Sequence, residues 1–243
     1  MKRSTTPLFA SAIPLLLGAC TQQGIMLSTD GIPSNSPPVT PSIAYPNVMS
    51  RNSVTRHYIA EDGARFEEII EPTTDPDTLA KITRLENDEV VLVRTIVGTA
   101  DGGIGVSEVL EADRGLITRF APPLVLMPGN LGQEPFMQRV NVTVSPEDDP
   151  SAVERKGTGQ LVMRLADPEA ATDQANRQAT HSVASTMALS FPPASVKRHS
   201  GRFFDTSGLV EEVWDERITV FGITSDEEQR RLILHKDTPR DSE

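Results

Sequence analysis

The chain has 243 residues, with 34 acidic and 23 basic side chains, a formal charge of −11 and a single cysteine. This negative balance excludes the basic surface that nucleic-acid binding needs. One cysteine excludes an internal disulfide framework and any zinc or iron–sulfur site built from several cysteines. Hydrophobic residues make up 37% of the chain, and 19 prolines with 16 glycines predict many turns or a loosely structured segment.

The first twenty residues have the pattern of a secretory signal peptide. Lys2 and Arg3 precede an apolar run over residues 8–17, and small residues follow the run. A helix that stays in the membrane needs roughly 20 apolar residues, so this run is too short to remain as a membrane span. We therefore expect the segment to direct export.

The apolar run ends in Leu17, Gly18, Ala19 and Cys20, and this tetrapeptide resembles the lipobox of bacterial lipoproteins. In that family the signal peptidase recognises the three residues before the cysteine, and the cysteine thiol carries a diacylglycerol. The resemblance implies that residues 1–19 are removed and that Cys20 is the site of lipid attachment. It covers only these twenty residues, so it implies an address and an anchor but no activity.

The residue after the cysteine is Thr21. Aspartate at this position usually marks retention in the inner membrane of Gram-negative bacteria. In such a host the resemblance therefore implies the outer membrane, with the protein facing the periplasm. Loss of Lys2 and Arg3 would change the formal charge from −11 to −13. Anionic head groups would repel such a chain, so the acyl chains must hold it at the membrane.

Residues 20–54 are predicted to form the acylated cysteine and a disordered tether. The segment is rich in Ser, Thr, Asn, Gln and Pro, and prolines stand at 33, 37, 38, 41 and 46. Such a composition buries too little apolar surface to offset the entropy lost on ordering. A strand hidden around residues 43–48 is the alternative.

Residues 55–243 are predicted to form a single β-rich domain with a frayed C-terminal tail. Asp62 and Gly63 separate two β-prone runs, which is a strong hairpin signal. A β-branched run over 89–97 turns at a glycine-rich stretch and returns over 106–110. Each piece has the length of an ordinary strand.

Alternation of apolar and polar residues continues through the second half. On the strand expected over 210–220, Glu212 and Glu216 fall on the same face as Trp214 and Ile218. The remaining expected strands cover 116–120, 140–144, 161–165, 183–191 and 231–235.

A short surface helix is expected over residues 167–180, with Asp167 as its N-cap and Pro168 at its first position; a loop is the alternative. The Pro-Pro pairs at 122–123 and 192–193 are expected at edges or corners. The predicted fold class is mainly β: an antiparallel β-sandwich or a partly closed β-barrel with at most one or two short helices.

No motif supports catalysis. The glycine-rich stretch at 102–105 is followed by a strand pattern rather than the helix of a dinucleotide site. The Asp-Thr-Ser-Gly run at 205–208 differs by one position from the aspartic-protease signature and is interpreted as a turn. The four histidines lack metal-ligand spacing, and the acidic clusters at 67–71 and 211–216 are interpreted as solvated strand faces. We predict no catalytic residue, no metal site and no cofactor.

We therefore expect a lipid-anchored protein of the bacterial cell envelope that is not an enzyme. It would act as a binding or structural accessory module for an unidentified envelope protein. The alternative is a carrier of an apolar ligand in a β cavity, lined by Trp214, Phe203, Phe204 and Phe221. An envelope hydrolase is the further alternative, and it would need His, Ser and acidic side chains to converge in one cleft.

Overall fold

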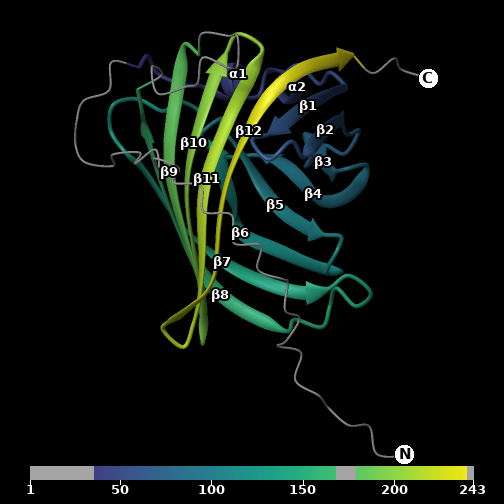
Figure 1. The fold of residues 1–243 in the computed structure, drawn as a ribbon, viewed down its shortest axis with the longest axis vertical. Helices are drawn as coiled ribbons and strands as arrows, with labels where there is room; N and C mark the ends of the chain where they lie inside the picture. The colour runs from purple at the N-terminus through teal and green to yellow at the C-terminus, as the bar shows by residue number, and fades with distance from the viewer. Residues whose placement is uncertain (1–35, 168–178, 240–243) are drawn as a thin grey trace, which may run out of the picture.

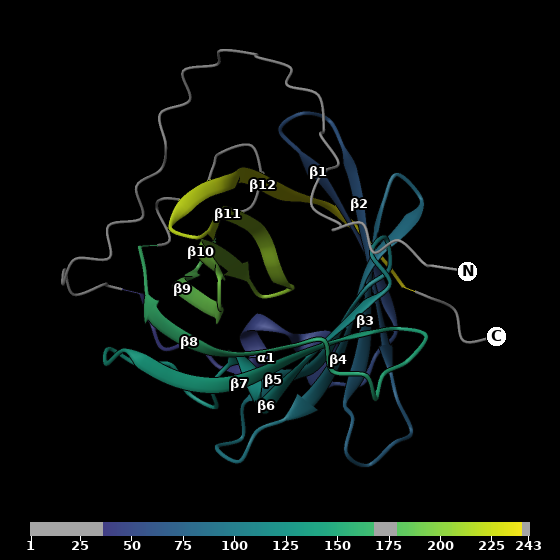
Figure 2. The ribbon, with the colours of Figure 1, turned by 90° about the horizontal axis from the view of Figure 1, so that it is seen from below.

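The computed structural model describes residues 36–167 and 179–239, and in this part of the chain twelve antiparallel strands close into a barrel. Each strand pairs with the next in sequence, and the first pairs with the last, as the ring in Figure 2 shows. The strands are β1 (Val54–Ala60), β2 (Arg65–Pro72), β3 (Ala80–Glu86), β4 (Glu89–Gly98), β5 (Ile104–Glu111), β6 (Leu116–Met127), β7 (Phe136–Pro146), β8 (Arg155–Leu165), β9 (His181–Phe191), β10 (Ala194–Asp205), β11 (Gly208–Val220) and β12 (Ile223–Pro239).

The structure confirms the prediction of a mainly β, antiparallel fold. Of the two expected architectures, a sandwich and a partly closed barrel, it has the barrel. This barrel is fully closed. The Asp62–Gly63 hairpin joins β1 to β2, with Gly63 at a positive φ of 86°. The glycine-rich stretch is the turn between β4 and β5, as expected. At the predicted Asp-Thr-Ser-Gly turn, the Ser207 backbone N–H donates to Asp205 Oδ1 at 2.7 Å, and the turn joins β10 to β11.

Two short helices, α1 (Pro41–Ala44) and α2 (Pro46–Met49), cover one end of the barrel (Figure 1). Val39, Ala44 and Val48 are almost fully buried there, and Val39 forms a β-bridge with Leu131. We call residues 39–49 the cap segment. The prediction of a disordered tether up to residue 54 is therefore wrong for this segment. Its few apolar side chains suffice because the open end of a barrel provides a matching apolar surface.

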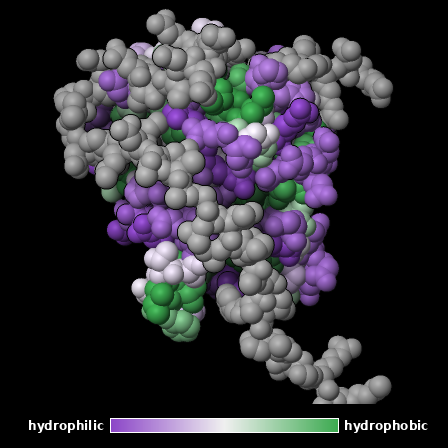
Figure 3. Space-filling view, in the orientation of Figure 1, coloured by the Kyte–Doolittle hydropathy of each residue, from purple (hydrophilic) through white to green (hydrophobic). Residues whose placement is uncertain are grey.

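The largest apolar cluster lies beneath the cap segment and lines the barrel interior. It includes Ile82, Ile96, Ile104 and Met127, none more than 2% exposed. A second cluster lies on the other side of the barrel and contains Tyr58, Ala60, Phe66, Phe203, Val210, Trp214, Leu232 and Leu234. On β1, β2 and β3 buried side chains alternate with more exposed ones, as expected for a closed barrel. The face shown in Figure 3 is accordingly mostly hydrophilic.

The wall between β6 and β7 is completed by a side chain. The backbone ladder between these strands ends at Ala121, which is joined to Pro122 by a cis peptide bond. Farther along, Gln138 Nε2 donates to the Pro123 carbonyl at 2.8 Å, and the Val125 N–H donates to Gln138 Oε1 at 2.9 Å. The first Pro-Pro pair therefore lies inside a long strand and not at an edge or corner, because an amide side chain replaces the missing ladder bonds.

Three other expectations have mixed outcomes. The second Pro-Pro pair, at 192–193, forms the turn between β9 and β10, as predicted. The last strand extends well beyond the expected 231–235. Residues 1–35, most of the helix expected over 167–180, and residues 240–243 of the predicted tail lie outside the described residues.

Candidate functional site in the barrel interior

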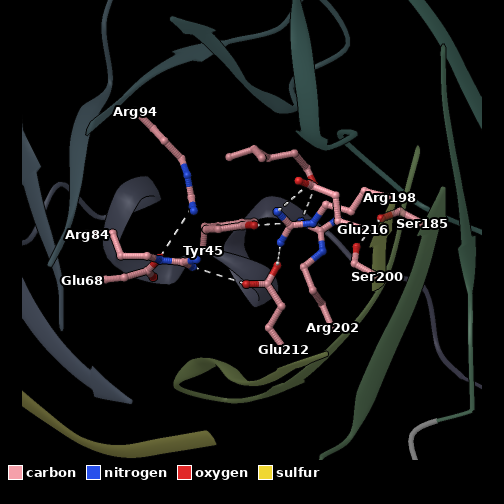
Figure 4. Close-up of polar contacts among 11 residues, drawn as sticks. Tyr45, Glu68, Arg84, Arg94, Ser185, Arg198, Ser200, Arg202, Glu212 and Glu216 are labelled. Atoms are coloured by element: carbon pink, nitrogen blue, oxygen red, sulfur yellow. Dashed lines mark hydrogen bonds and ion pairs between the residues drawn. The ribbon is translucent and has the colours of Figure 1, made fainter. Parts of the chain in front are cut away.

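Charged side chains share the inner face of the barrel with the apolar ones. On β2, the alternation that turns Phe66 and Ile70 inward also turns Glu68 inward. The register then places Arg84 of β3 directly opposite Glu68. Figure 4 shows the glutamate and arginine side chains that point into the barrel here. We call them the charged cluster: Glu68, Arg84, Arg94, Arg198, Arg202, Glu212 and Glu216.

Arg84 is the centre of this cluster. Its Nη2 lies 2.7 Å from Glu68 Oε1 and 3.3 Å from Glu212 Oε2, so one guanidinium joins β2 to β11. Burial alone would raise the pKa of Glu212, but Arg84 and Arg198 outweigh burial and lower it to about 2. Burial likewise opposes ionisation of Glu68, and Arg84 with Arg94 nevertheless lowers its pKa. Both carboxylates are therefore charged throughout the neutral range.

Arg198 of β10 lies on the opposite side of Glu212. Its Nη2 is 3.7 Å from Glu212 Oε1, and its Nη1 is 3.9 Å from Glu216 Oε2. The guanidinium carbon lies 4.7 Å from the centre of the Trp214 ring, which places the cation over the aromatic face. Burial lowers the pKa of Arg198, whereas burial raises that of Glu216. This part of the cluster is therefore paired less tightly than the Arg84 part.

Arg202 connects the charged cluster to the cap segment. Its Nη1 donates to Tyr45 Oη at 2.9 Å and to the Leu126 carbonyl at 3.2 Å. Tyr45 stands between α1 and α2 and points into the barrel (Figure 4). Among the described residues, the buried Nε of Arg202 has no hydrogen-bond partner.

Exposure of the inward-facing side chains rises away from the cap segment. Side chains of Glu68 and Arg84 are 8% and 10% exposed, that of Glu216 is 27% exposed, and that of Glu228 on β12 is 45% exposed. The apolar side chains beneath α1 and α2 are almost fully buried. Water therefore reaches the charged cluster from the end of the barrel opposite the cap segment, which we call the far end.

The charged cluster itself consists of arginine and glutamate side chains. The Ser185 and Ser200 hydroxyls bond to each other at 2.7 Å, and His199 Nδ1 bonds to Thr186 at 3.0 Å. Among residues 36–167 and 179–239, no group of three or more His, Cys, Asp or Glu side chains could hold a metal ion. The chemistry on offer is electrostatic recognition by guanidinium groups.

The four aromatic residues named from the sequence do not form one lining. Trp214 and Phe203 belong to the second apolar cluster, and Phe204 belongs to the cluster beneath the cap segment. Phe221 is 80% exposed at the turn between β11 and β12. Leu17, Gly18, Ala19 and Cys20 lie outside the described residues.

The interpretation of residues 67–71 and 211–216 as solvated faces is wrong for Glu68 and Glu211, which are 6% and 0% exposed, and for the Glu212 side chain, which is 13% exposed. A signal was present, because Glu212 and Glu216 fall on the apolar face of their strand. Acidic residues on such a face need cationic partners. The arginines that serve as these partners come from strands far away in the sequence, and no local pattern identifies them.

A shallow pocket of about 260 Å³ also lies at the β1–β12 seam, lined by Ile59, Ala60, Glu61, Ile233, Leu234 and His235. Its lining shares no residue with the charged cluster. Comparison of the chain with protein families, curated proteins and solved structures finds no match. Among the described residues, no helix is long and apolar enough to cross a bilayer.

Proposed function

We propose that this protein is a lipid-anchored, non-enzymatic binding module of the bacterial cell envelope, and that its ligand is recognised by the charged cluster inside the barrel. The observation that carries the binding role is the group of arginine and glutamate side chains accessible to water from the far end. The anchor rests on the resemblance of residues 17–20 to a lipobox.

Binding by charge has more support than binding of an apolar ligand. Phe203 and Phe204 are fully buried by neighbouring side chains, and the Trp214 ring is covered by Arg198. An apolar ligand that reached the cluster from the far end would have to strip water from several charged groups, which is costly. The hydrolase hypothesis has less support than either, because Ser185 and Ser200 near the charged cluster bond to each other and not to a base.

The anchor is tested by Cys20→Ser in the full chain, compared with Thr21→Ser, which keeps the thiol. Cells are labelled with a radioactive or alkyne-bearing fatty acid and fractionated. We expect Cys20→Ser to lose the label and to leave the membrane fraction or remain unprocessed, while Thr21→Ser stays labelled. Membrane-bound, labelled Cys20→Ser protein would refute the anchor.

The binding role is tested by purifying the anchored protein from its own envelope and identifying bound molecules by mass spectrometry. A polar, charged molecule recovered in near-stoichiometric amount is the expected result. A stoichiometric lipid or other apolar molecule would instead support the carrier. A tight complex with another envelope protein and no small molecule would support the accessory role.

A further inference from the structure

Three guanidinium groups approach one region of the barrel interior from opposite walls. Arg94 extends inward from β4, and Arg198 and Arg202 extend from β10 on the other side of Tyr45 (Figure 4). Together with Arg84, the charged cluster holds four arginines against three glutamates, Glu68, Glu212 and Glu216. The cluster therefore has one positive charge in excess.

These three guanidiniums are not fully used by the protein. Arg94 has its nearest carboxylate oxygen, Glu68 Oε1, at 3.6 Å, and the Arg198 ion pairs are 3.7 and 3.9 Å long. Such separations are longer than hydrogen bonds, whereas each guanidinium offers five N–H donors. Within the part of the chain that the structure describes, Arg202 keeps a buried Nε without an acceptor. Burial lowers the pKa of both Arg94 and Arg198, since the nearby carboxylates do not fully compensate.

Access to this region is from the far end, where three of the carboxylates form ion pairs. Arg230 forms ion pairs with Glu86 and Glu228, and Glu111 pairs with Arg114. The acidic groups near the entrance are thus partly neutralised. The side chains of Arg198 and Glu228 are 27% and 45% exposed, so the cluster becomes more accessible to water toward this end.

We infer that Arg94, Arg198 and Arg202 bind a phosphate group, carried by a small ligand that enters from the far end. This inference rests on the proposed binding function and names its ligand class. A tetrahedral phosphate has acceptor oxygens pointing in several directions, which suits guanidiniums arriving from two walls, and arginine binds phosphate through paired N–H donors. The anion would also balance the excess positive charge of the cluster.

The chain contains a built-in reporter for this test. Trp214 is the sole tryptophan, and its ring lies under Arg198. The experiment titrates the full processed chain, in detergent, with inorganic phosphate at constant ionic strength while Trp214 fluorescence is recorded. A parallel titration with glycerol 3-phosphate distinguishes free phosphate from a phosphate ester. We expect a saturable fluorescence change with at least one of the two probes.

Variants then locate the site. Arg94→Gln should weaken binding at least tenfold, and Arg94→Lys should weaken it less because the charge remains. The matched control is Arg217→Gln on β11, since Arg217 is half exposed and pairs with Glu227 outside the cluster; it should bind like the parent. Thermal unfolding verifies that each variant folds, and we expect Arg94→Gln to melt at or above the parent temperature because it removes a buried cation that the nearby carboxylates compensate only in part.

Two results would overturn the inference. One is a Trp214 fluorescence change that varies linearly with the concentration of both probes, without saturation. The other is saturable binding whose affinity is the same in Arg94→Gln and Arg94→Lys as in the parent. Either result would leave the lipid anchor and a different ligand possible. The fatty-acid labelling and the mass spectrometry of bound molecules decide those separately.

Discussion

Arg84 Nη2 on β3 lies 3.3 Å from Glu212 Oε2 on β11, although 128 residues separate them in the chain. The same guanidinium holds Glu68 on β2. This contact spans the barrel interior and ties together walls that share no backbone hydrogen bond. Buried ion pairs of this kind contribute little net stability compared with a well-packed apolar core, but removal of one partner is costly. Their role here is to hold arginines in place around the interior.

Glu212→Gln should destabilise the barrel by on the order of 3 kcal/mol at neutral pH, because it leaves Arg84 and Arg198 without their shared carboxylate. The pKa of Glu212 is lowered from 4.5 to about 2 in the folded state. Its contribution is therefore present above pH 4.5 and is lost as the pH falls toward 2. Urea unfolding measured from pH 7 down to pH 2 should show the parent and the variant converging over this window.

The control for this experiment is Glu227→Gln on β12. Glu227 pairs with Arg217 at 2.8 Å but is half exposed, and exposed ion pairs contribute 0 to about 1 kcal/mol. We expect a small effect with little additional pH dependence. Equal losses in the two variants would contradict the central position given to Glu212.

Glu216→Gln should change the free energy of unfolding in the opposite direction from Glu212→Gln, although Glu216 is only four residues farther along the same strand. Burial raises the pKa of Glu216, so its neutral form is favoured in the folded state and its ionisation costs stability as the pH rises. The variant should be at least as stable as the parent at pH 7, and the gain should disappear below pH 4.5. A clear loss of stability at pH 7 would mean that its long contact with Arg198 outweighs burial.

Val48→Ala tests whether the cap segment is part of the fold. Val48 is 1% exposed beneath α2, whereas the next residue, Met49, is 41% exposed. We expect Val48→Ala to cost about 2 kcal/mol and Met49→Ala less than about 0.5 kcal/mol, measured by equilibrium unfolding. Similar small effects from both would show that the segment is dispensable to the barrel.

Gly208→Ala tests the contact between the cap segment and the β10–β11 turn. Gly208 has a φ of 106°, and a Cβ there would lie 2.9 Å from Pro46 Cδ. Gly63 also has a positive φ, of 86°, but a Cβ there meets nothing within 4 Å. Both alanine variants carry backbone strain, and only Gly208→Ala adds a clash. Gly208→Ala should therefore cost roughly 1 to 3 kcal/mol more than Gly63→Ala, as measured by their melting temperatures.

Much of the barrel could be predicted because its signals are local. The Asp62–Gly63 turn and the β-branched run at 89–97 each indicate a strand or hairpin without reference to distant residues. Complete closure could not be predicted, because pairing between β1 and β12 depends on twist and register accumulated over the whole sheet. The folded cap segment was missed for a related reason: its apolar residues are few, and only the barrel end makes them buried.

The charged cluster was only half visible in the sequence. Glu212 and Glu216 are each two residues from Trp214, so the sequence already placed these acidic side chains on the same strand face as an apolar one. The partner of Glu212, Arg84, lies on β3, eight strands before β11 in the meander, beyond the reach of any spacing rule. The predicted aromatic lining does not converge because consecutive side chains of a strand point to opposite faces, so Phe203 and Phe204 enter different clusters.

Pairing of Val54 with Pro239 at the seam joins the beginning of the barrel to its last residues. Until β12 is in place, β1 and β11 both expose unpaired strand edges, and such edges can pair with other chains. The chain must therefore be kept from aggregating until nearly all of it has emerged. A stop codon before residue 223 would remove the whole of β12 and would leave an open sheet with two unpaired edge strands. Even a short C-terminal truncation should therefore make this protein prone to aggregation.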